Sequence, residues 1–123
     1  MGDAATLTDF LRYCKQNYPA EKTAVLFWNH GGGSVSGAAF DERYGYDSLT
    51  LDEMQTAFGR VWEADENNPP LELVGFDTCL MATVDVAGTF AGTARYLVAS
   101  EEVEPANGWD YTCLLYTSPS PRD

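Results

Sequence analysis

A continuous apolar run from Thr23 to Trp28 is the feature that most limits how this chain can fold. The run is rich in β-forming residues and does not alternate, which is typical of a strand buried on both faces of a parallel sheet. Two further strand-like runs follow, LELVGFDTC at residues 71–79, which ends in a turn, and RYLVAS at residues 95–100. Helical patterns precede and separate these runs. Such alternation predicts an α/β fold, an αβα sandwich of three layers around a parallel sheet.

Two helices are predicted before the second strand. Residues 6–18 place apolar side chains at helical spacing and end before Pro19, which puts Cys14 on the core-facing side. Thr50 and Glu53 fit the capping box that opens a helix, and the apolar residues that flank this cap fit the hydrophobic staple. We therefore expect one helix before the first strand and one after it along the chain.

Composition narrows the classes of function. A chain of 123 residues is one domain at most, and a formal net charge of −12 argues against binding to nucleic acid or to anionic membranes. No apolar run approaches the roughly 20 residues of a membrane span, and no basic segment precedes an apolar one as in a signal peptide. Three cysteines and one histidine without metal-binding spacing favour free thiols over a disulfide framework or a zinc site.

Potentially reactive residues follow two of the predicted strands. Ligands of parallel α/β sheets bind beyond the carboxyl ends of the strands, where His30 follows the first strand and Cys79 the second. If these strands are neighbours, the two side chains meet at one edge, as a Cys–His pair requires. We also expect a helix that starts near Cys79 or Leu80 and favours the thiolate. The amides of Gly31 and Cys79 could then form an oxyanion hole.

Other interpretations of these residues stay open from the pattern alone. A histidine after a strand is often a polar turn residue, and a cysteine at a helix start is often structural. The stretch from His30 to Gly33 also matches the oxyanion motif of some α/β-hydrolase esterases, although the G-x-S-x-G motif is absent. Phosphate binding is disfavoured because no Lys-Ser/Thr pair follows the glycines.

Three stretches of this chain resemble the clostripain family of cysteine peptidases. They are LFWNHGGGSVSG, LELVGFDTCLMATVDVA and YLVASEEVEPANGWDY. The resemblance implies a caspase-like αβα sandwich in which His30 is the catalytic histidine and Cys79 is the nucleophile of a thioester mechanism. A catalytically silent relative that acts as a binding module is the alternative within the same fold.

The resemblance also implies cleavage of proteins or peptides after Arg or Lys. A basic side chain at the P1 position, which precedes the cleaved bond, needs a buried carboxylate. Asp77 matches that position and Asp110 is a second candidate. The structural alternative for Asp77 is to cap a helix that starts near Cys79.

Family members are in some cases activated by a cut between the histidine and cysteine strands. Here that connection is a Gly-rich stretch that contains Arg43, which we predict as a self-cleavage site. Part of the family depends on calcium, and Asp41, Glu42 and Asp47 are candidate ligands that do not fit EF-hand spacing. No other cofactor is expected.

The resemblance ends at Thr112. We therefore expect a partial peptidase domain at residues 1–112, incomplete at both ends and inactive by itself, from a longer secreted or cell-surface protein. Residues 113–123, CLLYTSPSPRD, resemble a translated transposase adapter from sequencing-library preparation, which would make this tail non-native. A natural Ser/Pro-rich tail is the alternative.

Overall fold

The parallel sheet predicted from the sequence forms the centre of the molecule. The structure is a computed structural model that describes residues 2–116. The sheet has the order β1-β4-β5, with β1 at Ala24–Trp28, β4 at Leu71–Asp77 and β5 at Ala94–Val98. Both pairings are parallel, so β4 lies between the other two strands. The prediction of a parallel α/β sheet is confirmed.

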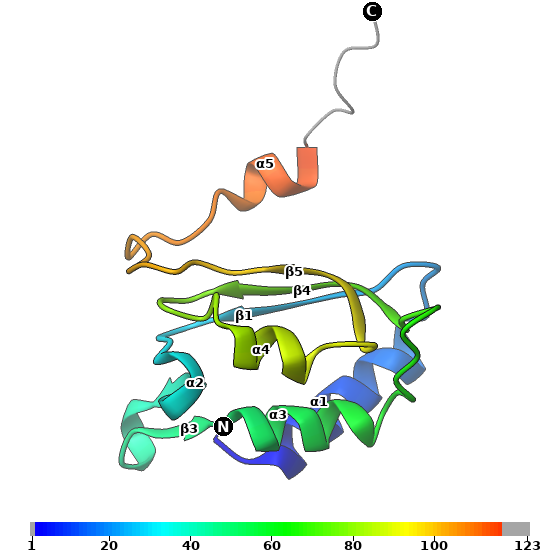
Figure 1. Cartoon of the computed structure of the whole chain (residues 1–123), viewed down its shortest axis with the longest axis horizontal. Helices are drawn as coiled ribbons and strands as arrows, with labels where there is room; N and C mark the ends of the chain where they lie inside the picture. Colours follow the sequence, from blue (N-terminus) through cyan, green and yellow to red (C-terminus); the bar gives the residue numbers. More distant parts are fainter. Residues whose placement is uncertain (1, 117–123) are drawn as a thin grey trace, which may run out of the picture.

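Three helices cover one face of this sheet. Figure 1 shows α1 (Ala4–Asn17), α3 (Leu51–Gly59) and α4 (Val84–Thr89) together on one side. The segment that leads to α5 (Tyr111–Tyr116) runs over the opposite face. There the ring of Trp109 and the side chain of Leu26 lie over Gly75, close enough that a Cβ atom on this residue would overlap them. The glycine therefore lets the C-terminal segment approach the central strand.

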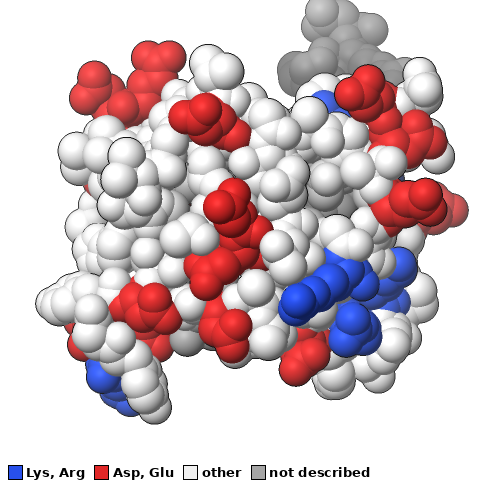
Figure 2. Space-filling model, turned by 60° about the horizontal axis from the view of Figure 1, so that its bottom comes forward, with Lys and Arg blue, Asp and Glu red and all other residues white. Residues whose placement is uncertain are grey.

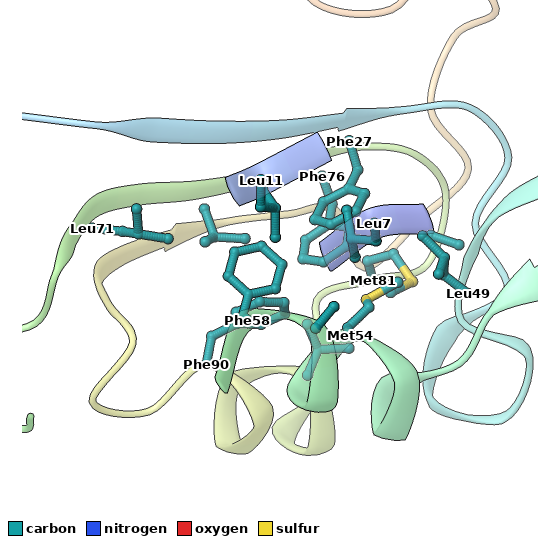
Figure 3. Packing of buried hydrophobic residues seen from close by; sticks show 14 residues of the cluster. Leu7, Leu11, Phe27, Leu49, Met54, Phe58, Leu71, Phe76, Met81 and Phe90 are labelled. Atoms are coloured by element: carbon teal, nitrogen blue, oxygen red, sulfur yellow. The ribbon is translucent and has the colours of Figure 1, made fainter. Parts of the chain in front are cut away.

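Aromatic side chains dominate the core between the sheet and the three helices. Phe27 of β1 stacks on Phe76 of β4, with ring centroids 4.8 Å apart and planes 7° from parallel. Phe58 of α3 meets the ring of Phe90 edge-on at 5.2 Å. Figure 3 shows these rings packed with leucine and methionine side chains. This cluster ties both strands to the helical layer, and so it fixes where β1 and β4 end.

The first strand differs from its prediction. Its exposure pattern leaves only Phe27 buried, whereas Leu26 is 37% and Trp28 is 69% exposed. Within the described residues, helices cover only the face to which Phe27 points. The expectation that Thr23–Trp28 is buried on both faces is therefore wrong here. Cys14 was predicted in the core, but it is only half-buried because it lies at the rim of a hollow beside Leu26 and Trp62.

The start of α3 follows its prediction. The Thr50 hydroxyl accepts a hydrogen bond from the Glu53 N–H, and the Glu53 carboxylate accepts one from the Thr50 N–H at 2.9 Å. Leu49 before the cap and Met54 after it are both buried in the core, as a hydrophobic staple requires.

The Gly-rich connection between β1 and α3 is folded rather than open. It contains α2 (Gly33–Ser36), the antiparallel pair of β2 (Ala38–Asp41) and β3 (Asp47–Leu49), and the 3-10 helix η1 (Glu42–Tyr44). Ala38 and Leu49 are buried, which anchors both strands of this hairpin on the core. The hairpin therefore stands beside the carboxyl end of β1.

Charge is distributed unevenly over the surface. Figure 2 shows acidic side chains spread across the face in view, whereas most of the basic side chains on that face gather in one area at the lower right. The Glu72 carboxylate lies 3.2 Å from Lys22 and 3.6 Å from Arg95. None of the helices in residues 2–116 has both the length and the apolar character needed to cross a membrane.

Candidate active site

The register of β1 and β4 brings His30 and Cys79 to the same edge of the sheet. Trp28 pairs with Asp77 at the ends of the two strands. His30 and Cys79 both come two residues after this pair. Both residues line one hollow of about 420 Å³ beyond the carboxyl ends of the strands. The two strands are neighbours, which is the condition that the sequence analysis set, and the two candidate catalytic residues share one cavity.

Gly31 lies directly against the backbone of Cys79. A Cβ atom at position 31 would overlap the carbonyl oxygen of Cys79. Gly31 also forms an isolated bridge with Ala38. The two hydrogen bonds of this bridge run from the Gly32 N–H to the Gly37 carbonyl and from the Ala39 N–H to the His30 carbonyl. The Gly31 amide therefore takes no part in them. This amide and that of Cys79 lie at the same sheet edge, and their role as an oxyanion hole stays a prediction.

The His30 side chain faces an acidic residue of the hairpin. Its Nε2 atom lies 3.9 Å from Glu42 Oε1, and the two side chains are 72% and 66% exposed. Water screens a contact this open, so it adds little stability. The hairpin nevertheless forms one wall of the hollow, because Phe40 and Glu42 line it together with His30.

Cys79 does not start a helix, which corrects the sequence prediction. It lies in a turn, and α4 begins only at Val84, with the Thr83 hydroxyl as the cap. Leu80 has a φ of 62°, which a helix does not allow. The Leu80 N–H instead donates to the Glu102 carbonyl at 3.2 Å, and the Ala82 N–H donates to the Ser100 carbonyl at 3.0 Å. These long-range bonds replace the helical ones, so no helix N-terminus supports the thiol.

A different group contacts the thiol. The Glu104 N–H donates a hydrogen bond to Cys79 Sγ at 3.3 Å. The side chain of Glu104 accepts a hydrogen bond from the Trp109 indole N–H, also at 3.3 Å. The sequence did not predict either contact, because nothing in the stretch YLVASEEVEPANGWDY connects Glu104 or Trp109 with Cys79.

Asp77 is buried beside the candidate nucleophile. It is 3% exposed and lines the same hollow as Cys79. Its Oδ2 atom accepts hydrogen bonds from the Trp109 N–H at 3.0 Å and the Tyr111 hydroxyl at 2.8 Å. Its Oδ1 atom is buried and has no hydrogen-bond partner within the described part of the chain. Such an oxygen is costly to bury unless a ligand meets it.

The surroundings of Asp77 are built closely around its carboxylate. Gly108 has a φ of 65°, and a Cβ atom there would lie 2.5 Å from Asp77 Oδ2. Burial, the hydrogen bond to Asp77 and the charge of Asp77 raise the pKa of Tyr111 to about 12. Tyr111 therefore stays a neutral donor at physiological pH. The alternative role of Asp77 as a helix cap is wrong, because Thr83 caps α4.

Asp110 lies apart from this hollow. Its exposed carboxylate accepts hydrogen bonds from the N–H groups of Thr112 and Cys113, at 3.0 and 3.2 Å, at the start of α5. Hydrogen bonds from Cys113 are the main cause that lowers the pKa of Asp110. The structure brings Asp77 together with Cys79 but does not bring Asp110 there.

The remaining predicted residues lie on the hairpin. Arg43 is exposed in η1, and its N–H donates to the Asp41 carboxylate at 3.0 Å. Asp41 and Asp47 are paired across the hairpin. Within residues 2–116, no three His, Cys, Asp or Glu side chains gather as a metal ion would require. Calcium binding by Asp41, Glu42 and Asp47 thus gains no geometric support and stays a prediction.

The comparisons with known proteins agree on one family. The sequence matches the model of the Clostripain family over residues 1–123. Clostripain from Hathewaya histolytica is 34% identical over 122 residues. A secreted C11 cysteine protease from Bacteroides thetaiotaomicron, in complex with an irreversible peptide inhibitor, superposes with a TM-score of 0.80 at 22% identity. An inactive zymogen C11 protease from Parabacteroides distasonis gives 0.65 at 23% identity.

The matches differ in how much of each protein they cover. They span 90%, 92% and 88% of this chain, but 23% of clostripain, 32% of the Bacteroides structure and 29% of the Parabacteroides structure. The chain therefore corresponds to less than a third of the length of each of these proteins. The family match runs through residue 123 and draws no boundary at Thr112. The separate origin of residues 113–123 stays a prediction, and residues 117–123 lie outside the described part.

Proposed function

Because the chain belongs to the clostripain family, we propose that it carries the catalytic pair and the specificity acid of a cysteine endopeptidase that cleaves after Arg or Lys. The observation that supports this most is the unpartnered buried oxygen of Asp77 in the hollow shared by Cys79 and His30. A cationic side chain is the ligand that such an oxygen favours.

In the proposed reaction, Cys79 attacks as a thiolate after its proton has passed to His30. The Sγ atom bonds to the carbonyl carbon of the basic residue, and the oxyanion meets the amides of Gly31 and Cys79. The C–N bond then breaks as His30 gives its proton to the leaving amine. Water hydrolyses the thioester, which releases the acid product and restores the thiol.

The hollow accounts for the preference for a basic residue. Its wall contains Trp28 and Phe40, whose rings suit the apolar stem of Arg or Lys, and the buried Asp77 meets the charge. The neutral Tyr111 and the Trp109 amide hold Oδ2 and leave Oδ1 for the substrate. We propose secretion as well, by analogy with the Bacteroides relative. Fractionating cultures into cells and medium would test the location.

A covalent probe tests the proposal directly. An arginyl chloromethyl ketone peptide is expected to alkylate Cys79 in the complete protein, and Cys79→Ala is expected to abolish that adduct, as read by mass spectrometry of the digested protein. A norleucyl analogue of the same length is the matched control and should react far more slowly. Equal labelling of Cys79 by both reagents would refute the basic preference, and no labelling would favour the silent binding module.

Self-cleavage at Arg43 is a second expectation, because this residue is exposed in the hairpin beside the candidate site. The Arg43→Ala protein should remain one chain where the unchanged protein becomes two, as seen by denaturing electrophoresis and intact mass. Arg60→Ala is the matched control, since Arg60 is exposed at the end of α3. Two chains of the same sizes from Arg43→Ala, apart from the mass of the substitution itself, would exclude this cut.

The esterase alternative rested on the His30–Gly33 stretch. Membership of the clostripain family, whose model matches residues 1–123, favours the peptidase over the esterase for the same stretch.

A further inference from the structure

Trp109 contacts three parts of the candidate site at once. Its main-chain N–H donates to Asp77 Oδ2 at 3.0 Å. Its indole N–H donates to Glu104 Oε1 at 3.3 Å. Its ring lies over Gly75, where a Cβ atom would come within 3.0 Å of it. One residue thus links the central strand, the buried acid and the loop that reaches the thiol.

The loop between Glu104 and Trp109 is short and closed on itself. The Gly108 N–H donates to the Pro105 carbonyl at 2.9 Å, and Gly108 has a φ of 65° that favours glycine. With this turn on one side and the indole contact on the other, residue 104 has little freedom. Its N–H points at Cys79 Sγ, 3.3 Å away.

This contact matters because Cys79 does not stand at the N-terminus of α4. Thr83 caps α4, and Cys79 lies four residues before that cap. A hydrogen bond donated to a charged group favours the charged form. The sequence pattern wrongly assigned the role of donor to a helix N-terminus. The Glu104 amide is the group placed to donate to a thiolate at Cys79.

We infer that Trp109 is a positioning residue that holds the Glu104 amide against the Cys79 sulfur through its indole contact with the Glu104 side chain. The inference rests on the proposed role of Cys79 as nucleophile. It concerns the state of the thiol and not the choice of substrate, so iodoacetamide, a small reagent without a basic group, tests it separately.

The experiment compares alkylation of Cys79 in the full chain and in Trp109→Phe, which keeps a ring over Gly75 but loses the indole donor. Mass spectrometry of the digest resolves Cys79 from the other two cysteines. At pH 7 the rate of alkylation of Cys79 in the variant should fall to roughly a third or lower, because one donor to the thiolate is lost. At about pH 10, where a free thiol is already ionised, the two rates should converge.

A merely structural role for Trp109 predicts the opposite. A loosened loop would expose the sulfur, so alkylation would become faster at both pH values. An unchanged or faster rate in Trp109→Phe would overturn the inference. Trp62→Phe is the matched control, because Trp62 packs on Phe58 on the other face of the sheet, and its rate should equal that of the unchanged chain.

Two variants of Glu104 keep the test decisive if Trp109→Phe fails to fold. Glu104→Gln retains a carbonyl acceptor for the indole and should react at the original rate. Glu104→Leu retains the main-chain amide but loses the acceptor, and it should show the same slowing as Trp109→Phe. Equal rates for the two Glu104 variants would also overturn the inference. Failure of the arginyl probe with this pattern intact would count against the proposed function and leave the inference about Trp109 standing.

Discussion

Asp77→Asn is expected to reduce kcat/KM for substrates with Arg at the P1 position by roughly a hundredfold to several thousandfold. Removing one partner of a buried ion pair costs about 3–5 kcal/mol, and each 1.36 kcal/mol is about tenfold in rate. Asparagine can still accept the hydrogen bonds from Trp109 and Tyr111 through its carbonyl oxygen. Its amide group would then replace Oδ1 and direct N–H donors at the cationic substrate. The change therefore reverses the polarity of the pocket without emptying it.

The measurement is kcat/KM of the complete protein on paired peptides that differ only in Arg or norleucine at P1. Cleavage of the norleucine peptide should change little in Asp77→Asn. Asp110→Asn is the matched control, because its carboxylate is exposed and caps α5 away from the hollow. It should keep the preference for Arg. A similar loss on both peptides in Asp77→Asn would mean that Asp77 supports the fold and does not select the substrate.

Much of the candidate site could be predicted from the sequence because strand ends are local signals. An apolar run that stops at a polar residue marks a carboxyl end of a strand, and parallel pairing brings such ends together. His30 and Cys79 were found in this way, and the pairing of Trp28 with Asp77 confirms their common edge. The cap at Thr50 was equally local, since both partners lie within four residues.

The errors arise where distant contacts decide the local structure. Residues 80–82 have side chains that favour helix, yet the N–H groups of Leu80 and Ala82 bond to the carbonyls of Glu102 and Ser100, and Leu80 takes a positive φ. Helix propensity is a weak prior that such contacts override. The burial of β1 was overestimated because an apolar run does not show whether other elements cover one face of the strand or both.

The contacts of Asp77 and Cys79 with the C-terminal loop were missed for a related reason. Trp109 and Tyr111 lie more than thirty residues after Asp77 and donate to one of its oxygens. A buried acid needs such donors, and aromatic residues with a polar atom commonly supply them. Trp109 and Tyr111, which flank Asp110, were the signal for these donors in the sequence, but the prediction assigned a role to Asp110 instead.

Phe58→Ala is expected to lower the free energy of unfolding of the chain by about 3–5 kcal/mol, the usual cost of removing a buried phenylalanine ring. Phe58 of α3 is 1% exposed and packs on Phe27 of β1 and on Phe90, the residue that follows α4. Its ring centroid lies 6.3 Å from that of Phe27 and 5.2 Å from that of Phe90. Figure 3 shows the ring between the helix and the sheet.

Urea unfolding followed by circular dichroism measures this loss, and Phe10→Ala is the matched control. Phe10 undergoes the same chemical change on α1 but is 60% exposed, so its loss should stay below about 1 kcal/mol. Folded domains are commonly stable by only about 5–15 kcal/mol. A Phe58→Ala chain that is already unfolded without urea would therefore also agree with the expected loss. Equal losses in the two variants would show that the aromatic cluster does not hold the helical layer on the sheet. In that case the strand ends that carry His30 and Cys79 would have to be fixed by the hairpin and the C-terminal loop instead.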